Sequence, residues 1–301
     1  HIKTITGLEN LVLGGTQVTD DGLEQLRGLT NLKHLYLNHT EQVTDAGLEH
    51  LKGLTSLNEL SLWGTQVTDA GLEHLQGVTK LRVLPLNGTQ VTDAGLERLK
   101  RLTALQSLHV NGTSVSDAGL EHLKGLTNLR RLHLNGTQVT DDGLEHLREL
   151  TSLEWLELED TKVSDDGLEH LKWLPSLSRL NFRNTRVTDD GLERLQVLTK
   201  LRVLSIRGTQ VTDDGVKHLV VLPNLAWLDL GSTQVSDAGL EYVAVLPNLD
   251  SLDLRNTQVT DAGLEHLQGL TNLRWLLHLS GTRVTDDGLK YLKGLTNLQT
   301  L

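Results

Sequence analysis

The sequence predicts an α/β solenoid with a parallel β-sheet on its concave face and short α-helices on its convex face. Three observations predict this architecture. A 24-residue unit repeats along the chain, each unit begins with apolar residues at strand spacing, and each unit continues with a helix-start signal. A unit of this size cannot bury its apolar face alone, so successive units must stack into a continuous core.

The repeat has the form L-x-x-L-x-L-x-x-T-x-V-[TS]-D-[DA]-G-L-x-x-L-x-x-L-[TP]-x, and its 24 positions are called columns 1 to 24. Twelve complete repeats run from residue 8 to residue 297, with partial repeats at 1–7 and 298–301. One extra residue occurs near Glu41, and another occurs within Trp275–His278. We therefore expect residues 1–301 to form a single domain without separate capping domains. Both ends fall inside a repeat, so we also expect flanking sequence in a longer parent protein.

The first part of each repeat predicts a strand. Columns 4 and 6 are apolar, and the two-residue period of a strand places them on one buried face. One strand per repeat, always returning through a helix, gives a parallel sheet. Helices need about 10 Å each and strands about 4.8 Å, which bends the stack into a horseshoe. Column 9 is always threonine, whose hydroxyl we expect to bond the turning backbone and form a polar ladder.

The second part of each repeat predicts a short helix. Column 12 is always Thr or Ser, as an N-cap requires, and column 13 is always Asp, which we expect to stabilise the helix N-terminus. The alternative interpretation of this Asp series is a calcium or catalytic site, but no repeat is singled out. Column 15 is always Gly, which lowers helix propensity, so we expect close packing between repeats there. Columns 16, 19 and 22 are apolar and face the sheet.

These motifs resemble a known family. L-x-x-L-x-L is the strand signature of leucine-rich repeats, and the resemblance covers essentially the whole chain. The V-T-D-x-G-L continuation is similar to the cysteine-containing subclass of F-box substrate receptors, with Thr in place of Cys or Asn. The G-L-T-N-L junction is similar to internalin-type repeats and to tandem bacterial proteins. The resemblance implies the fold of a leucine-rich-repeat solenoid, and the fold alone does not determine the function.

Composition narrows the function further. The chain has 28 Lys and Arg against 39 Asp and Glu, for a net charge of −11, which argues against a nucleic-acid binder. Columns 13, 14 and 17 hold 28 of the 39 acidic residues, so the negative charge belongs mostly to the helix starts and the outer face. The absence of Cys excludes disulfide scaffolds, zinc knuckles and thiol catalysis. No signal or transmembrane segment is recognisable, which leaves cytoplasmic, secreted and cell-surface locations open.

The candidate binding residues lie in columns 3, 5 and 7, which vary from repeat to repeat on the concave face. Four of the five tryptophans fall on this face, and exposed Trp beside Arg is typical of interaction hot spots. The alternative interpretation is neutral variation at unconstrained positions. The predicted partner-binding residues are His34, Tyr36, Trp63, His109, His133, Trp155, Glu157, Glu159, Arg179, Arg183, Arg207, Trp227, Asp229, Asp253, Arg255, Trp275 and His278.

Two clusters within this set suggest catalysis or metal binding. His109, His133 and Glu157 occupy column 5 of three successive repeats and are plausible zinc ligands. A flat row with steps of about 5 Å converges poorly on one ion, so we predict no metal site. Asp229 and Asp253 are adjacent in the same column and resemble a carboxylate pair for acid–base work. No nucleophile or deep cleft is predicted beside them, which favours an ordinary polar strand face.

We therefore predict a non-catalytic protein–protein interaction scaffold that binds its partner on the concave face, with no catalytic residue, metal or cofactor. Alternative functions are an internalin-like bacterial surface adhesin, an F-box-type substrate receptor fragment, a metal-assisted enzyme that uses His109 and His133, and a purely structural or designed repeat scaffold. The expected partner is a protein, with no nucleic acid and no membrane insertion. Uncapped terminal repeats also suggest end-to-end self-association.

Overall fold

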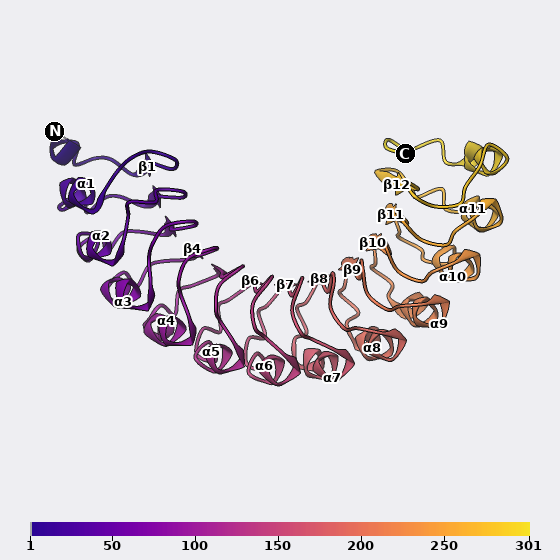
Figure 1. Ribbon diagram of the computed structural model, residues 1–301, viewed down its shortest axis with the longest axis horizontal. Helices are drawn as coiled ribbons and strands as arrows, with labels where there is room; N and C mark the ends of the chain where they lie inside the picture. Colours follow the sequence, from indigo (N-terminus) through magenta and orange to yellow (C-terminus); the bar gives the residue numbers. More distant parts are fainter. Residues whose placement is uncertain (1) are drawn as a thin grey trace. The chain divides into compact units, whose positions relative to one another are not determined.

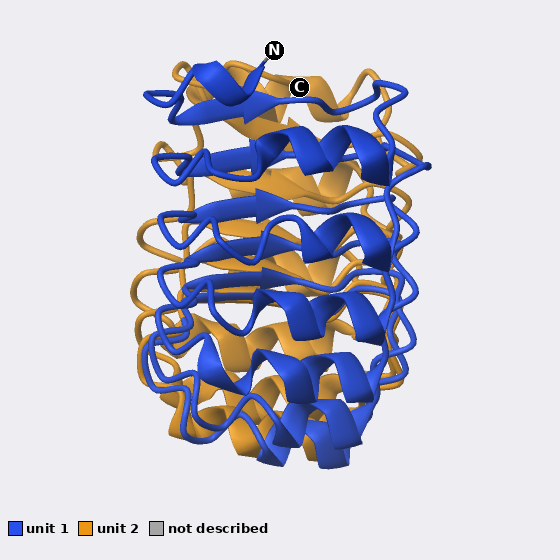
Figure 2. Ribbon diagram, turned by 90° about the vertical axis from the view of Figure 1, so that its left-hand side faces the viewer, with its two compact units in different colours: residues 1–153 blue, residues 154–301 orange. Residues whose placement is uncertain are grey.

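The structure is a computed structural model that describes residues 2–301. The chain divides into two compact units, residues 1–153 and 154–301, shown in different colours in Figure 2. Within each unit, every repeat places its strand on the inner side and its helix on the outer side (Figure 1). This arrangement confirms the predicted leucine-rich-repeat solenoid with a parallel sheet and short helices. The assignment of residues 1–301 to a single domain stays a prediction.

The strands are three residues long and pair in parallel, in chain order, within each unit. With one exception they occupy columns 3 to 5, so equivalent columns lie side by side on neighbouring strands. In unit 1 the strands are β1 (Asn10–Val12), β2 (His34–Tyr36), β3 (Glu59–Ser61), β4 (Val83–Pro85), β5 (Ser107–His109) and β6 (Arg131–His133). In unit 2 they are β7 (Trp155–Glu157), β8 (Arg179–Asn181), β9 (Val203–Ser205), β10 (Trp227–Asp229), β11 (Ser251–Asp253) and β12 (Leu276–His278).

Each α-helix begins at the Asp of column 13 and is short, often continuing as a 3-10 turn. In unit 1 the helices are α1 (Asp20–Leu23), α2 (Asp45–Glu49), α3 (Asp69–Leu72), α4 (Asp93–Arg98), α5 (Asp117–Glu121) and α6 (Asp141–Glu145). In unit 2 they are α7 (Asp165–Leu168), α8 (Asp189–Arg194), α9 (Asp213–Val216), α10 (Asp237–Val243) and α11 (Asp261–Leu267). The 3-10 helices are η1 (Ile2–Thr4), η2 (Glu24–Leu26), η3 (Glu73–Leu75), η4 (Leu99–Arg101), η5 (Glu169–Trp173), η6 (Leu195–Val197), η7 (Lys217–Val221) and η8 (Gly288–Gly294).

Leucine fills most of the interior. From the second repeat to the eleventh, the strand leucine of column 4 and the apolar residue of column 6 are both buried, as with Leu35 and Leu37, which are 0% exposed. The single phenylalanine, Phe182, takes a column 6 position and is also 0% exposed. Column 9 threonine confirms the predicted polar ladder, because its hydroxyl donates to the column 6 carbonyl of the same repeat. In Thr113 this bond to the Val110 carbonyl is 2.7 Å long.

The aspartate of column 13 has a different main role from the one predicted. Instead of acting chiefly on its own helix, it bonds the next repeat within each unit. Asp93, for example, accepts from the Ser116 backbone N–H at 2.7 Å and from the Ser116 hydroxyl at 2.6 Å. Ser116 makes no side-chain cap bond to its own helix α5. Some threonines do cap as predicted, as when Thr68 accepts from the Ala70 N–H at 3.2 Å.

The column 15 glycine is explained by the same bridge. A Cβ added to Gly119 would overlap Oδ1 of Asp93, the oxygen that accepts from Ser116 N–H. The same overlap recurs at equivalent glycines, for instance between Gly71 and Asp45. The expected close packing between repeats is therefore confirmed, and its specific cause is the bridging carboxylate.

The exception to the strand register is the last repeat. The repeat pattern places Trp275 in column 3, but Leu276 takes that position, because Leu276 pairs with Ser251 and His278 with Asp253. That placement is wrong because the extra residue is absorbed just before β12 rather than within it. Trp275 consequently precedes the strand, where it is 48% exposed and its ring lies 4.9 Å from the Arg274 guanidinium.

Candidate functional site

The inner face of unit 2 contains a groove of about 250 Å³ that spans strands β7 to β10. Val203 and Ser205 of β9 contribute short side chains to its lining, between longer side chains on the neighbouring strands. Trp155 on β7 and Trp227 on β10 are both half-buried and stand on its two sides. The groove is therefore a depression over β9 that is flanked by two indole rings.

The tryptophan on the β7 side is held by its neighbours. The guanidinium of Arg179 lies 5.1 Å from the centre of the Trp155 ring, which is a cation–π distance. The Trp155 indole N–H donates to the carboxylate of Glu157, two residues along the same strand. These contacts fix the ring orientation on the groove wall.

Side chains of opposite charge line the groove on and directly after strands β7 and β8. Asn181 donates to Glu157 at 2.7 Å and to Glu159 at 3.2 Å, so one amide joins both carboxylates. Arg183 Nε lies 3.4 Å from Glu159 Oε1. Acidic and basic residues of this face therefore pair with each other here, and the groove carries both charges without a strong excess of either.

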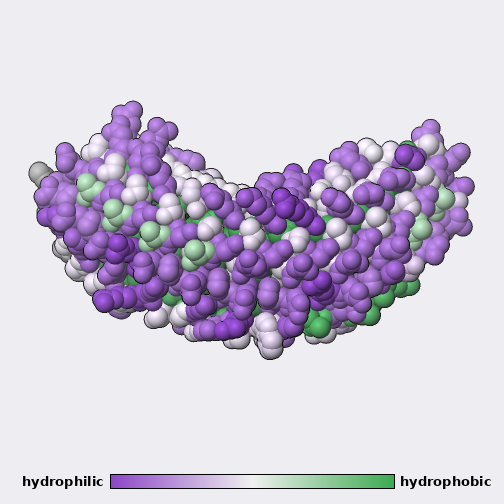
Figure 3. Space-filling model, turned by 60° about the horizontal axis from the view of Figure 1, so that its bottom comes forward, coloured by the Kyte–Doolittle hydropathy of each residue, from purple (hydrophilic) through white to green (hydrophobic). Residues whose placement is uncertain are grey.

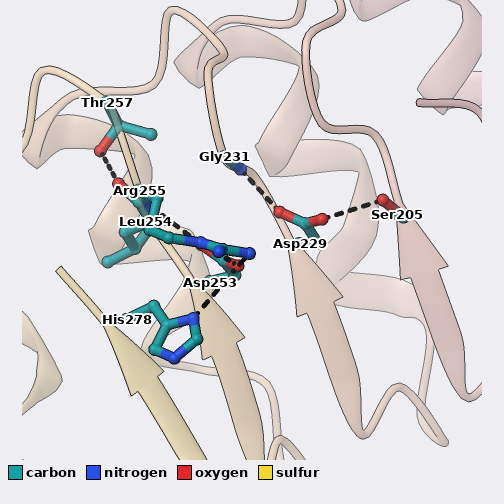
Figure 4. A network of polar contacts seen from close by, with 8 residues as sticks. All are labelled: Ser205, Asp229, Gly231, Asp253, Leu254, Arg255, Thr257 and His278. Carbon is teal, nitrogen blue, oxygen red and sulfur yellow. Dashed lines mark hydrogen bonds and ion pairs between the residues drawn. The ribbon is translucent and has the colours of Figure 1, made fainter. Parts of the chain in front are cut away.

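A second polar network adjoins the groove on β9 to β12 (Figure 4). Asp229 is 5% exposed and accepts from the Gly231 N–H at 2.9 Å and from the Ser205 hydroxyl at 3.0 Å. Asp253 is 1% exposed and forms an ion pair with Arg255, whose Nε contacts both carboxylate oxygens at 3.0 and 2.8 Å.

His278 completes this network from β12, with Nδ1 lying 3.4 Å from Asp253 Oδ2 (Figure 4). Paired across neighbouring strands, Asp229 and Asp253 have pKa values that move in opposite directions. Burial raises the pKa of Asp229; the Gly231 N–H opposes this, and the charge of Asp253 adds to it. Burial also disfavours the charged form of Asp253, but the hydrogen bonds and charge of Arg255 outweigh it and lower its pKa. Both carboxylates are thus used by protein donors.

Arg207 lies at column 7 between these two networks. Its Nη1 is buried and makes no hydrogen bond to any residue between 2 and 301. A Cβ at Gly231 would lie 2.9 Å from Arg207 Nη1 and 3.0 Å from Asp229 Oδ1. Because residue 231 is Gly, the Arg207 guanidinium has space beside Asp229. The positive charge of Arg207 lowers the pKa of Asp229 and so opposes the effect of burial.

The predicted residues in the first half of unit 1 form smaller, separate contacts. His34 Nδ1 lies 2.6 Å from Asn10 Oδ1, and the Tyr36 hydroxyl donates to Glu59 Oε2 at 3.0 Å. Burial is the largest cause of a raised pKa at Tyr36, followed by that bond to Glu59. Trp63 is 47% exposed, and its ring packs 4.6 Å from the ring of His39.

His109 and His133 stack on neighbouring strands, with ring centres 4.0 Å apart and planes 10° apart. Burial, together with the charge of Arg131, lowers the pKa of His133 to about 4, so this ring is neutral at pH 7. Stacked rings direct their nitrogen lone pairs along parallel planes, which do not converge on one ion. Over residues 2–301 no group of three His, Asp or Glu is arranged to hold a metal ion.

Several groove residues were not among the predicted site residues. Asn181, Val203 and Ser205 line the groove together with the buried Leu180. The signal was present in the sequence, because Val203 and Ser205 place small residues in columns 3 and 5 between two Trp-bearing repeats.

Among the helices of residues 2–301, none has the length and apolar character needed to span a membrane.

Comparisons with known proteins give a consistent picture. The family described as "Leucine-rich repeat region" matches residues 1–197, and that described as "Leucine Rich repeat" matches 197–220 and 245–267. An internalin of Listeria monocytogenes is 31% identical over 99% of this chain and 81% of its own, with a TM-score of 0.78. Internalin C2 of the same organism is 29% identical over 69% of this chain and 83% of its own, with a TM-score of 0.54.

A leucine-rich-repeat protein of Leptospira interrogans has the same fold, with a TM-score of 0.68 at 19% identity over 100% of this chain and 85% of its own. Among functionally curated proteins, no sequence matches this chain.

Proposed function

The chain belongs to the leucine-rich-repeat family, and we propose that it is a non-catalytic interaction protein that binds a protein partner on the inner face of unit 2. The observation that carries this proposal is the groove of about 250 Å³ between Trp155 and Trp227. Large aromatic side chains that flank a depression are the usual anchors of protein interfaces, because they bury much area at little cost in side-chain entropy.

The chemistry of the groove indicates what the partner presents. Trp155, Trp227 and Val203 offer apolar contact, and Ser205 adds a small polar group. Ion-paired charges below them provide a polar rim rather than a strongly charged surface. A partner that inserts an apolar side chain between the tryptophans, flanked by hydrogen-bonding groups, matches this arrangement.

A non-catalytic role fits the state of the titratable groups. Asp253 is enclosed by Arg255, and Asp229 is occupied by Ser205 and Gly231, so neither carboxylate is directed at a substrate. The stacked pair of His109 and His133 is likewise occupied by its own packing. These groups support a recognition surface rather than acid–base chemistry.

Selection of peptides from a displayed random library tests the proposal. Peptides that bind the wild-type protein should lose affinity for W155A and for W227A by about 30-fold each, because a hot-spot tryptophan contributes roughly 2 kcal/mol, and W155A/W227A should lose more than either. Calorimetry with the soluble, monovalent peptide measures this change. The triple variant W155A/W227A/W275A shows whether Trp275, which lies outside the groove, also contributes.

The matched control is Trp173→Ala, which removes an exposed tryptophan from the outer side of the same unit. It should leave peptide affinity unchanged. Equal affinity of wild type and the triple variant for every selected peptide would overturn the assignment of the site.

A more specific candidate function is that of an internalin-like adhesin on a bacterial surface. The observation that favours it is the identity of 31% over 99% of this chain to an internalin. Under this proposal the parent protein carries export and anchoring segments outside residues 1–301. Surface proteolysis of the source cells, followed by detection of this repeat region, tests the location directly.

A further inference from the structure

The outer side of unit 2 carries a strip of exposed apolar side chains that the inner-face function does not use. It consists of Trp173, Val197, Val220, Val221, Tyr242 and Val245, and we call it the outer strip. Their exposed fractions are 55%, 60%, 36%, 50%, 38% and 63%, respectively. Figure 3 shows hydrophobic residues gathered along the lower right edge of the molecule, on the helix side of this unit.

The outer strip follows the repeat. Trp173, Val197, Val221 and Val245 all occupy column 21 in four successive repeats; the first three end a 3-10 helix, and Val245 follows two residues after the end of α10. The other eight repeats have Gly, Arg or Glu in this column: Gly28, Gly53, Gly77, Arg101, Gly125, Glu149, Gly269 and Gly294. Column 21 thus carries a large apolar residue in four consecutive repeats and in no other. The outer strip is therefore a local feature of these repeats and is not required by the repeat itself.

Proline extends the same surface. Column 23 is Pro at Pro175, Pro223 and Pro247, three of the four prolines in the chain, and all three are exposed. Isolated surface apolar residues need no explanation, but a continuous apolar strip on a soluble protein marks an interaction site. The outer strip therefore needs a partner.

We propose that the partner is a second copy of this chain, packed antiparallel on the outer strip about a two-fold axis between Val197 and Val221. The spacing of the strip supports this partner. Outer helices of neighbouring repeats lie about 10 Å apart, and a second copy presents apolar side chains at the same interval. The two-fold axis places Val197 opposite Val221 of the other copy.

Size and charge agree with the antiparallel arrangement. The largest side chain, Trp173, lies at one end of the strip and meets Val245 and Tyr242 of the other copy. Lys172, whose Nζ lies 2.9 Å from Glu169 Oε1 of its own chain and 5.5 Å from the Trp173 ring centre, is brought to the end that carries Glu241. The only ion pair that Glu241 makes within residues 2–301 is with His266, at 3.8 Å. The rims of the two copies are thus complementary, and a parallel arrangement would set like charges together.

Sedimentation velocity on the protein over a wide range of concentrations tests the dimer. The expected result is a species of twice the chain mass of 33.2 kDa that grows no further. A monomer at every concentration would overturn the proposal. Open-ended growth would also overturn it, because it indicates end-to-end stacking of terminal repeats.

Two variants test the register. V197E and V221K each place a charge against an apolar residue of the other copy, so each alone should sediment as a monomer. Mixed in equal amounts they should form a heterodimer, because the carboxylate introduced in one chain then meets the ammonium group introduced in the other. Failure of the mixture to associate would contradict the antiparallel pairing. R101E, at the same column in unit 1, is the matched control and should remain dimeric.

Cysteine chemistry provides an independent measurement. The chain contains no cysteine, so V197C and V221C each introduce a single thiol. Under mild oxidation the mixture should give a 197–221 disulfide between chains in preference to 197–197 or 221–221. Preferential formation of either symmetric disulfide would contradict the proposed axis.

Discussion

The hydrogen bonds between the column 13 aspartate and the next repeat predict that the effect of one substitution depends on another. Asp93 bonds Ser116 twice, and Gly119 leaves the space that the Asp93 carboxylate occupies. We expect Gly119→Ala to destabilise the wild-type protein but not a protein that lacks the carboxylate. The two substitutions should therefore be strongly coupled.

The magnitude follows from the bonds involved. Hydrogen bonds to a charged acceptor are worth about 1.5 to 3 kcal/mol each when lost, and these two are only partly buried, so D93A should cost about 2 to 4 kcal/mol. G119A displaces the same carboxylate and incurs most of this loss. Ala has a higher helix propensity than Gly by about 1 kcal/mol, which leaves a net cost of about 1 to 3 kcal/mol.

In the D93A background the nearest neighbour of the same Ala is the Leu96 Cδ1 atom, at 3.1 Å, and this is the mobile end of a side chain. G119A should then be neutral or stabilising by up to about 1 kcal/mol. The backbone presents no obstacle, because Gly119 is not among the residues with a positive φ.

Urea unfolding of the wild type, both single variants and the double variant, followed by circular dichroism, measures the coupling. The midpoint should fall for each single variant, and the double variant should be no less stable than D93A. Asp93→Asn is the matched control, because it keeps one acceptor oxygen and should lie between wild type and D93A. An equal cost of G119A in both backgrounds would refute the reasoning, since it would mean that Gly119 is required by something other than Asp93.

Three further outcomes are expected. Thr113→Val removes the 2.7 Å bond from the buried Thr113 hydroxyl to the Val110 carbonyl and should cost about 1 kcal/mol in urea unfolding, whereas a cost near zero would mean that shape alone selects Thr. The pKa of His133 should be about 4 in an NMR titration, against an ordinary value of 6.5. Because the unfolded chain takes up this proton first, the contribution of His133 to stability should be lost as pH falls from about 6.5 to about 4, and H133Q should weaken that dependence. Burial raises the pKa of Asp229, so the folded protein should lose stability as pH rises from the ordinary pKa of Asp to this raised pKa. D229N should remove this loss, and an unchanged pH dependence of stability in that variant would contradict the effect of burial.

The repeat period explains why the fold could be predicted from the sequence. A constraint that recurs twelve times separates structural columns from free ones, and burial of Leu35 and Leu37 follows that division. Bonds between repeats were harder to predict. Asp93 and Ser116 each have a local explanation as helix-start residues, and only the folded structure brings them together across 23 positions.

The candidate site could be predicted at the level of the face and not of the groove. Columns 3, 5 and 7 identify residues such as Trp155 and Trp227, but the depression between them depends on short neighbours at Val203 and Ser205. The large aromatic residues can be identified from the sequence, whereas the depression depends on which smaller residues lie beside them in the folded sheet. The outer strip was not predicted, although column 21 is Trp or Val in four successive repeats and Gly, Arg or Glu in all the others.

The inner groove and the outer strip belong to the same repeats but to different columns. Column 3 supplies Trp155 and Trp227 to the sheet face, while column 21 supplies Trp173 and Val245 to the helix side. Because the intervening columns are held constant by core packing and by the aspartate bridges, either surface can change without disturbing the other. A dimer through the outer strip would leave the inner groove of each copy uncovered, so it would present two equivalent grooves. Binding to a multivalent partner would then gain from effective concentration, and V197E should lose that gain while keeping its affinity for a single soluble peptide.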